Sequence, residues 1–136
     1  MKDITPYFTF NGNARQAMTF YKEVLGGDLE LMTFENSPTE VPADAKDRIM
    51  HATLSNGTIT LMASDTMPNQ TTTNGNSVSL SINCSSVEEI DRLYNSLSEG
   101  GEITMPLQDT FWGARFAILT DKFGICWMFN YDYPQA

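Results

Sequence analysis

The chain contains one histidine, His51, the side-chain type best suited to act as a general base near neutral pH. It lies in the string RIMHATLS, which predicts a strand. A histidine base is commonly oriented by a carboxylate, and Glu35, Asp47 and Asp109 are all available in the sequence. The competing interpretation is a histidine that is hydrogen-bonded at a sheet edge or in a pocket wall. His51 is therefore a candidate pocket group or base, with its partner left open.

Trp112 and Arg115 form a second candidate pair, in the string PLQDTFWGAR. A tryptophan could stack on a planar ligand and an arginine could bind a carboxylate. Phe111, Trp112 and Trp127 are, however, also typical of a core or a dimer contact. Arg48 occupies the place that matches Arg115 in an internal repeat, so a structural role for both arginines is equally open.

Composition limits the classes of partner. Seventeen acidic against eight basic residues give a net charge of −9, which disfavours nucleic acids and anionic membrane surfaces and suits a cationic ligand. Cys84 and Cys126 are expected to be buried, reduced thiols. The chain contains no Gly-rich phosphate loop, GxSxG, CxxC or HExxH pattern. Because the N-terminus MKDITPYFTF is not apolar like a signal peptide, we expect a cytoplasmic protein.

The elements that must position these residues occur twice. Residues 48–65 and 115–132 align without a gap at an offset of 115 − 48 = 67, sharing an Arg, a Thr, a Gly and an Asp. Each segment has apolar runs on either side of a glycine turn, which predicts a β-hairpin. Upstream, Tyr21 matches Tyr94, and Gly26-Gly27 matches Gly100-Gly101. Each half thus predicts the order strand, helix, strand, hairpin.

The two helices have recognisable ends. The first is expected to begin at Asn13, with Gln16 completing a relative of the capping box, and to stop at Gly26. In the second, Ser86 and Glu89 form the capping-box pattern. Apolar residues recur at helical spacing on one side of each helix, as expected for helices packed on a sheet.

The strand before each helix alternates between apolar and polar residues. One side carries Ile4, Phe8 and Phe10 in the first half and Val78, Leu80, Ile82 and Cys84 in the second. The other side carries Thr5, Tyr7 and Thr9, then Ser77, Ser79, Ser81 and Asn83. The polar sides either face solvent or line a shared cup, and in the second case Tyr7 is a candidate ligand contact.

At this point the chain resembles the vicinal oxygen chelate superfamily, which includes glyoxalase I, extradiol dioxygenases and bleomycin-resistance proteins, and within it the PhnB-like subgroup. The residues that carry the resemblance are PYFTFNGNARQAMTFYKEVLGG, the segment from His51 through LMASDTMP, and DTFWGARFAILTDKFGICWMFN. The resemblance implies an α+β fold of two βαβββ modules, whose mixed sheet curves into a cup with the helices outside. It also implies a homodimer with a small-molecule ligand in the cup. One domain of residues 1–136 would contain modules at about 4–65 and 77–132, joined by a polar linker at 66–76.

The resemblance also indicates where a catalytic relative would hold its divalent metal, on four side chains from the first and last strands of the two modules. Carried onto this chain, these positions are Thr5, Leu61 (or Thr60), Ser77 and Met128. They contain neither a carboxylate nor an imidazole, the ligands that such metals prefer. We therefore predict that the chain has no metal site there and no cofactor. Met128 instead suits an adaptable apolar pocket.

The sequence is compatible with three functions. The favoured one is a metal-free small-molecule-binding protein, in which a bleomycin-resistance-like sequestering role would suit a cationic guest. The second is a glyoxalase-like lyase or isomerase, or a dioxygenase, that uses a displaced metal or His51 as base. The third is an interaction module whose cup is filled by side chains and whose dimer surface carries the function.

Overall fold

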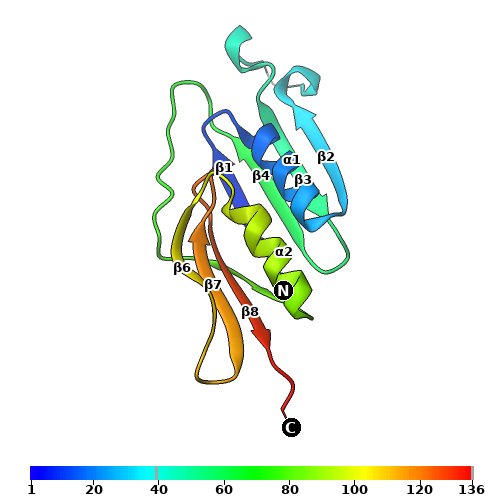
Figure 1. The fold of residues 1–136 in the computed structure, drawn as a ribbon. Coiled ribbons are helices and arrows are strands. Elements are labelled where there is room, and N and C mark those ends of the chain that lie inside the picture. Colours follow the sequence, from blue (N-terminus) through cyan, green and yellow to red (C-terminus); the bar gives the residue numbers. More distant parts are fainter. Residues whose placement is uncertain (39, 136) are drawn as a thin grey trace. The chain divides into compact units, whose positions relative to one another are not determined.

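A computed structural model describes residues 1–38 and 40–135, which fold as two compact units, Met1–Thr73 and Asn74–Ala136 (Figure 1). The first unit contains β1 (Tyr7–Phe10), α1 (Ala14–Leu25), β2 (Asp28–Thr33), two short 3-10 helices (Phe34–Asn36 and Ala43–Ala45), β3 (Ile49–Ser55) and β4 (Thr60–Asp65). The second contains β5 (Leu80–Asn83), α2 (Val87–Ser98), β6 (Glu102–Asp109), β7 (Ala114–Thr120) and β8 (Cys126–Asp132). The predicted βαβββ order is confirmed in both halves.

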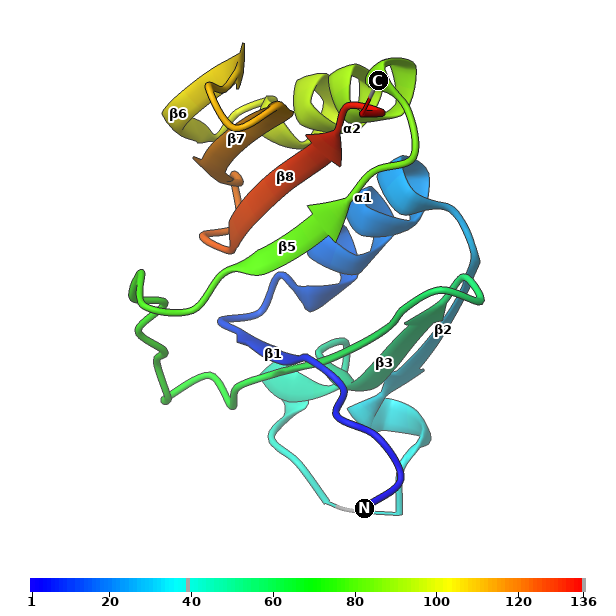
Figure 2. The same ribbon diagram turned by 90° about the horizontal axis from the view of Figure 1, so that it is seen from below.

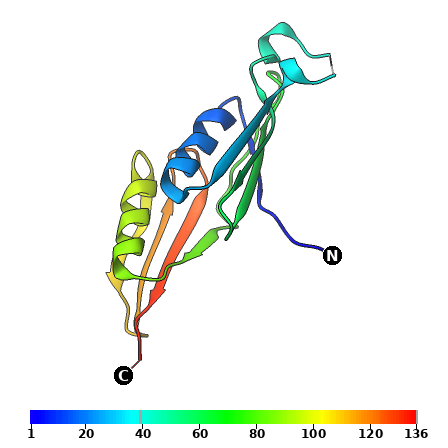
Figure 3. The ribbon, with the colours of Figure 1, turned by 90° about the vertical axis from the view of Figure 1, so that its right-hand side faces the viewer.

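Each unit has one four-stranded mixed sheet with the same topology. The strand orders are β1-β4-β3-β2 and β5-β8-β7-β6, and in each sheet the first strand is parallel to its neighbour while the other pairs are antiparallel. Figure 2 shows α2 along one face of the second sheet, and Figure 3 shows α1 along one face of the first. The α+β fold class predicted from the sequence is thus confirmed.

The apolar stripe of each helix packs on its own sheet. In the first unit the ring of Tyr21 lies 5.9 Å from that of Phe8, and in the second the ring of Tyr94 meets Phe129 edge-on at 6.0 Å. Ile4 and Val78, predicted to continue these apolar faces, are instead 84% and 78% exposed. They lie upstream of the strands, because β1 begins only at Tyr7 and β5 at Leu80.

The two hairpins repeat, but the gapless alignment at an offset of 67 is wrong. Ala52 pairs with Ala63 in the first hairpin, whereas Ala117 pairs with Phe129 in the second. The buried strand residues therefore correspond at offsets of 117 − 52 = 65 and 129 − 63 = 66. The extra residue lies in the turn, which spans residues 56–59 in the first hairpin and 121–125 in the second.

The glycine pairs after the helices are equivalent in space as well as in sequence. A Cβ added at Gly27 would collide with the carbonyl oxygen of Ser55, and one added at Gly101 would collide with that of Thr120. Ser55 and Thr120 are themselves related by the offset of 65, so both units use the same close approach between backbones.

The cap of α1 differs from the expected one. Among the described residues the Asn13 side chain caps no backbone N–H; instead, Asp65 at the end of β4 accepts hydrogen bonds from the N–H groups of Gly12 (3.0 Å) and Ala14 (2.9 Å). The other oxygen of Asp65 accepts the N–H of Ile49 at 2.8 Å. A carboxylate supplied across the sheet thus replaces the local cap.

The cap of α2 is the predicted one. The hydroxyl of Ser86 accepts the N–H of Glu89 at 3.1 Å, and the carboxylate of Glu89 accepts the N–H of Ser85 at 2.8 Å. In the part of the chain that the structure describes, neither helix is long and apolar enough to cross a membrane.

Replacing Asp65 by Ala should lower the free energy of unfolding by about 3 kcal/mol, because a helix cap is lost and buried N–H groups lose their acceptor. Urea denaturation measures the change. Asn13→Ala is the matched control and should stay within about 0.5 kcal/mol of the parent. A larger loss in the Asn13 variant than in the Asp65 variant would contradict the capping assignment.

Gly101→Ala should lower the free energy of unfolding by about 2–3 kcal/mol, since the new methyl group meets backbone atoms that cannot move aside. Gly57→Ala is the control. It has a φ of +87° and open space around the added Cβ, so only the left-handed backbone costs energy, about 1 kcal/mol. Equal losses in the two variants, measured in urea, would mean that the close approach at Gly101 has little effect.

Candidate functional site

The sheet face that points away from α1 forms the first candidate surface, here called the first open face. Strand alternation directs Ala52, Leu54, Leu61 and Ala63 into the core, so their neighbours in the chain point the other way. The first open face consists of Tyr7 and Thr9 from β1, Thr60, Met62 and Ser64 from β4, His51, Thr53 and Ser55 from β3, and Asp28, Glu30 and Met32 from β2.

His51 lies at the centre of a hydrogen-bonded chain on this face. Its Nδ1 is 3.2 Å from the hydroxyl of Tyr7, and its Nε2 is 3.1 Å from the hydroxyl of Thr53. The rings of Tyr7 and His51 have centroids 5.7 Å apart. A phenol and an alcohol therefore contact the two ring nitrogens and are the partners that the sequence had left open.

Sequence reasoning identified Tyr7 and His51 separately but missed Thr53. The signal was present, because residues two apart in a strand share a face and Thr53 follows His51 by two. The contact between Tyr7 and His51 depends on long-range pairing: β1 lies next to β4, and β4 lies next to β3. The pattern of each strand taken alone does not show that these two side chains lie together.

Two methionines flank this chain. Met62 is the cross-strand partner of Tyr7 on one side and of Thr53 on the other, and Met32 is the partner of His51. Thioether side chains are apolar and adaptable, so they offer a surface that can follow the shape of a ligand. The polar chain is thus bordered by apolar groups.

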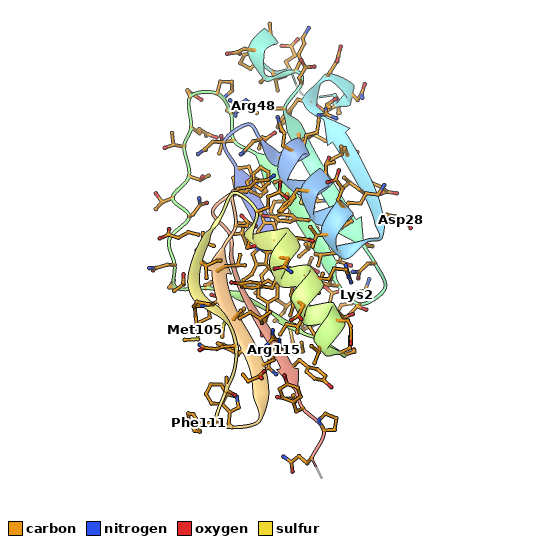
Figure 4. All side chains as sticks on the ribbon, in the orientation of Figure 1. Lys2, Asp28, Arg48, Met105, Phe111 and Arg115 are labelled. Atoms are coloured by element: carbon orange, nitrogen blue, oxygen red, sulfur yellow. The ribbon has the colours of Figure 1, made fainter. Side chains whose placement is uncertain are left out.

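The sheet of the second unit has a corresponding face, the second open face, which points away from α2. It consists of Ser81 and Asn83 from β5, Met128 and Asn130 from β8, Phe116, Ile118 and Thr120 from β7, and Met105 and Gln108 from β6. Trp112, which is 57% exposed, meets the ring of Phe116 edge-on at 6.2 Å. The candidates Trp112 and Met128 therefore belong to one surface, while Phe111 lies at the tip of the β6–β7 hairpin (Figure 4).

Arg115 lies on the other side of this sheet. Its Nε donates to Asp91 of α2 at 2.9 Å, and its Nη1 donates to Asp109 at 3.2 Å. These carboxylates, Asp91 first, raise the pKa of Arg115. Because α2 packs on the face opposite Met128, the structure does not bring Arg115 together with Trp112 and Met128. The guanidinium is already paired with two carboxylates of its own unit.

Asp109 also binds the segment after β8. The hydroxyl of Tyr133 donates to Asp109 at 2.6 Å. This hydrogen bond, followed by the one from Arg115, holds the pKa of Asp109 below its usual range. The same carboxylate raises the pKa of Tyr133, first because the hydrogen bond to Asp109 favours the protonated phenol and then because ionisation would place a second negative charge beside it. Arg48 is likewise engaged, donating to the carbonyl of Thr66 at 2.9 Å.

The positions at which a catalytic relative would hold metal can now be compared within each sheet. Thr5 and Ser77 precede β1 and β5, and Leu61 is buried under α1. Tyr7 pairs with Met62 as Ser81 pairs with Met128, so the counterpart of Met128 is Met62.

The donor groups at these positions do not fit a hard divalent cation. Phenol, hydroxyl and thioether groups stand where carboxylate or imidazole ligands would be needed. Across residues 1–38 and 40–135, no group of three or more His, Cys, Asp or Glu side chains is arranged to hold a metal ion.

The cysteines are both free. Cys84, directly after β5, is half-buried, and Cys126 is buried in β8. Burial, followed by the charge of Glu89, raises the pKa of the Cys84 thiol to about 11. The thiol of Cys84 is therefore protonated near neutral pH and a weak nucleophile.

Paired βαβββ units with helix-backed mixed sheets give each half the fold seen in glyoxalase/bleomycin-resistance proteins. The chain belongs to the family described as 3-demethylubiquinone-9 3-methyltransferase, whose model matches residues 2–129. It is 32% identical to Protein YjdN of Escherichia coli K12, over 93% of each chain.

Solved structures give the same result. Protein PA1353 from Pseudomonas aeruginosa is 47% identical, with a TM-score of 0.88 over 97% of this chain and 98% of that one. A PhnB protein from Bacillus cereus is 30% identical, with a TM-score of 0.72 over 96% and 99% of the two chains. Structures described as glyoxalase/bleomycin resistance proteins, 16–19% identical, share the fold with TM-scores of 0.59–0.61.

The carboxylate of Asp109 should control the ionisation of Tyr133. Asp109→Asn should lower the pKa of Tyr133 toward its ordinary value of about 10, because the negative charge that opposes ionisation is gone. The measurement is a pH titration of ¹³Cζ-tyrosine NMR signals, with Tyr133→Phe used for assignment. Asp91→Asn is the control and should leave the pKa of Tyr133 raised. An unchanged titration in Asp109→Asn would contradict the assigned hydrogen bond.

Proposed function

We propose that this chain binds a small organic molecule without the help of a divalent metal, with the first open face as its site. The observation that carries the proposal is the Tyr7–His51–Thr53 chain on the first open face, with Met62 between Tyr7 and Thr53 and Met32 opposite His51. A few convergent polar groups within an apolar surround are typical of small-molecule sites.

The second open face supports the same proposal with different chemistry. Trp112 and Phe116 offer aromatic surface, and the amides of Asn83 and Asn130 lie on neighbouring strands of the same face. Aromatic rings supply contact area, and amides can both donate and accept hydrogen bonds.

The homodimer and the cytoplasmic location expected from the sequence remain part of this proposal. Phe111 is 97% exposed at the tip of the β6–β7 hairpin, and an aromatic side chain in that position is suited to a subunit contact.

One observation favours an enzymatic alternative. The hydroxyl of Tyr7 is within hydrogen-bonding distance of His51 Nδ1, an arrangement that could pass a proton to or from a bound molecule. A glyoxalase-like lyase or isomerase, or a dioxygenase, remains the alternative on that ground. The matching family is described by a methyltransferase activity, which belongs among the reactions to be assayed.

The proposal is tested on protein purified without added metal. Native mass spectrometry for a co-purified ligand is combined with thermal-shift measurements over a broad panel of small molecules, with and without EDTA. A ligand at 100 times its Kd should stabilise the fold by about 2.7 kcal/mol, raising Tm by several degrees to the same extent in EDTA. Tyr7→Phe should reduce the shift, while Thr19→Ala, on the exposed side of α1, should not.

Two results would overturn the proposal. The first is the absence of any co-purified ligand together with no thermal shift over the whole panel. The second is stoichiometric Zn, Ni, Mn or Fe whose removal by EDTA abolishes binding. Turnover in a glyoxalase, dioxygenase or methyltransferase assay that disappears in His51→Ala would establish the enzymatic alternative instead.

A further inference from the structure

We infer that the Tyr7–His51–Thr53 chain is a reversible hydrogen-bonding site that accepts either donor or acceptor groups of a neutral or cationic ligand and selects against anions. This inference rests on the proposed function and names the ligand class of that site. Three observations support it: the two donor–acceptor directions that these three groups can adopt, the exposure of Tyr7, and the charges on the same face.

The hydrogen bonds along Tyr7, His51 and Thr53 can run in either of two directions. A neutral imidazole has one donor nitrogen and one acceptor nitrogen, whereas a hydroxyl group both donates and accepts. In the first direction His51 Nδ1–H donates to the Tyr7 oxygen, Thr53 donates to Nε2, and the Tyr7 O–H can donate to a ligand. In the second, Tyr7 donates to Nδ1, Nε2–H donates to Thr53, and the Tyr7 oxygen can accept from a ligand.

Tyr7 is the end of the chain that a ligand can reach. It lies on β1, whose one described partner strand is β4, and it is 49% exposed, whereas His51 and Thr53 lie on β3 between two strands and are half-buried. Because His51 can exchange its donor and acceptor nitrogens, a change of role at Tyr7 leaves all three groups hydrogen-bonded. The cost of an unsatisfied polar group is avoided in either direction.

The body of the ligand has an apolar seat beside this polar end. Met62 lies between Tyr7 and Thr53 in the cross-strand row, and Met32 lies opposite His51. Neighbouring strands are about 4.8 Å apart, so Met62 on β4 and Met32 on β2, with β3 between them, stand roughly 10 Å apart and offer apolar surface on both sides of His51 and Thr53.

The charges of the face are of one sign. The described residues of the first open face include no lysine or arginine, but Asp28 and Glu30 stand on β2, and Glu30 is the cross-strand partner of Thr53. These carboxylates attract a cation and repel an anion over distances within a Debye length of about 8–10 Å. A carboxylate or phosphate ligand would meet this repulsion without a cationic partner on the face.

Three probes of similar shape separate these properties: benzamidine, a cationic donor; acetophenone, a neutral acceptor; and benzoate, an anionic acceptor. Each is titrated into the full-length protein, and the imidazole ¹⁵N signals are followed by two-bond ¹H–¹⁵N NMR. The chain has one histidine, so the spectrum reports His51 alone. Acetophenone should drive His51 to the Nδ1–H tautomer and benzamidine to the Nε2–H tautomer. Benzoate should bind about tenfold more weakly than either.

Single substitutions show which residues cause the differences in affinity and in the His51 tautomer. Tyr7→Phe should weaken benzamidine and acetophenone by about fivefold and remove the tautomer response, since the hydroxyl that contacts the ligand is gone. Glu30→Gln should weaken benzamidine while leaving acetophenone unchanged. Thr19→Ala, on the exposed side of α1, is the control and should behave as the parent for all three probes.

The inference is overturned if both probes stabilise the same tautomer, if benzoate binds as tightly as benzamidine, or if none of the three perturbs His51. Its failure can be told apart from failure of the proposed function. If His51 does not respond but a ligand from the broad panel still raises Tm, the small-molecule function stands and this site assignment falls. If neither occurs, both fall.

Discussion

The first unit depends on one buried carboxylate. Asp65 receives the first N–H groups of α1 on one oxygen and the N–H of Ile49, at the start of β3, on the other. It thereby ties together the end of β4, the start of β3 and the N-terminus of the helix. With those three ends joined, α1 must lie along one particular face of the sheet, and the opposite face carries Tyr7, His51 and Thr53. The position of the candidate site is thus a consequence of a contact that lies on the other side of the sheet.

The second unit reaches the same topology with different contacts. Asp132 at the end of β8 is exposed, and α2 is capped locally by Ser86. The buried carboxylate of this unit is Asp121 in the turn before β8, which accepts the indole N–H of Trp127 at 2.8 Å and the N–H groups of Phe123 and Ile125. One architecture is therefore stabilised at the helix start in one unit and at the hairpin turn in the other. What the units share is the close backbone approach at Gly27 and Gly101.

The sequence predicted those features that depend on local periodicity. The helical stripe around Tyr21 and Tyr94, the capping box at Ser86 and both hairpins are written in residues close together in the chain, and all were confirmed. Asp65 was not predicted as a cap, because 51 residues separate it from Ala14 and only the fold brings them together. The gapless alignment of the two hairpins was wrong because identical residues at the segment ends matched without a gap, although the second turn is one residue longer. Arg48 precedes its strand, whereas Arg115 lies inside β7.

For the candidate site, the sequence supplied residue types but not their grouping. Tyr7 and His51 come together because β4 brings β1 next to β3, an arrangement that follows from topology rather than from spacing. Arg115 is separated from Met128 because side chains alternate between the two faces along a strand. Ile118, the partner of Met128, is three positions from Arg115 in β7, so Arg115 points to the other face. Assignments of this kind require the strand pairing, which the sequence pattern alone leaves open.

The alternation of side chains along each strand also separates positions that pack in the core from positions on the open face. From His51 onward in β3 and throughout β4, every second residue belongs to the core under α1, and the residues between them belong to the open face. Substitutions at the open positions can therefore change that face without disturbing the packing under the helix. The first unit presents an imidazole and hydroxyl groups on its open face, and the second presents amides and aromatic rings. The fold thus gives two open surfaces whose side chains can vary independently of each other, while the helix-packed core of each unit is retained.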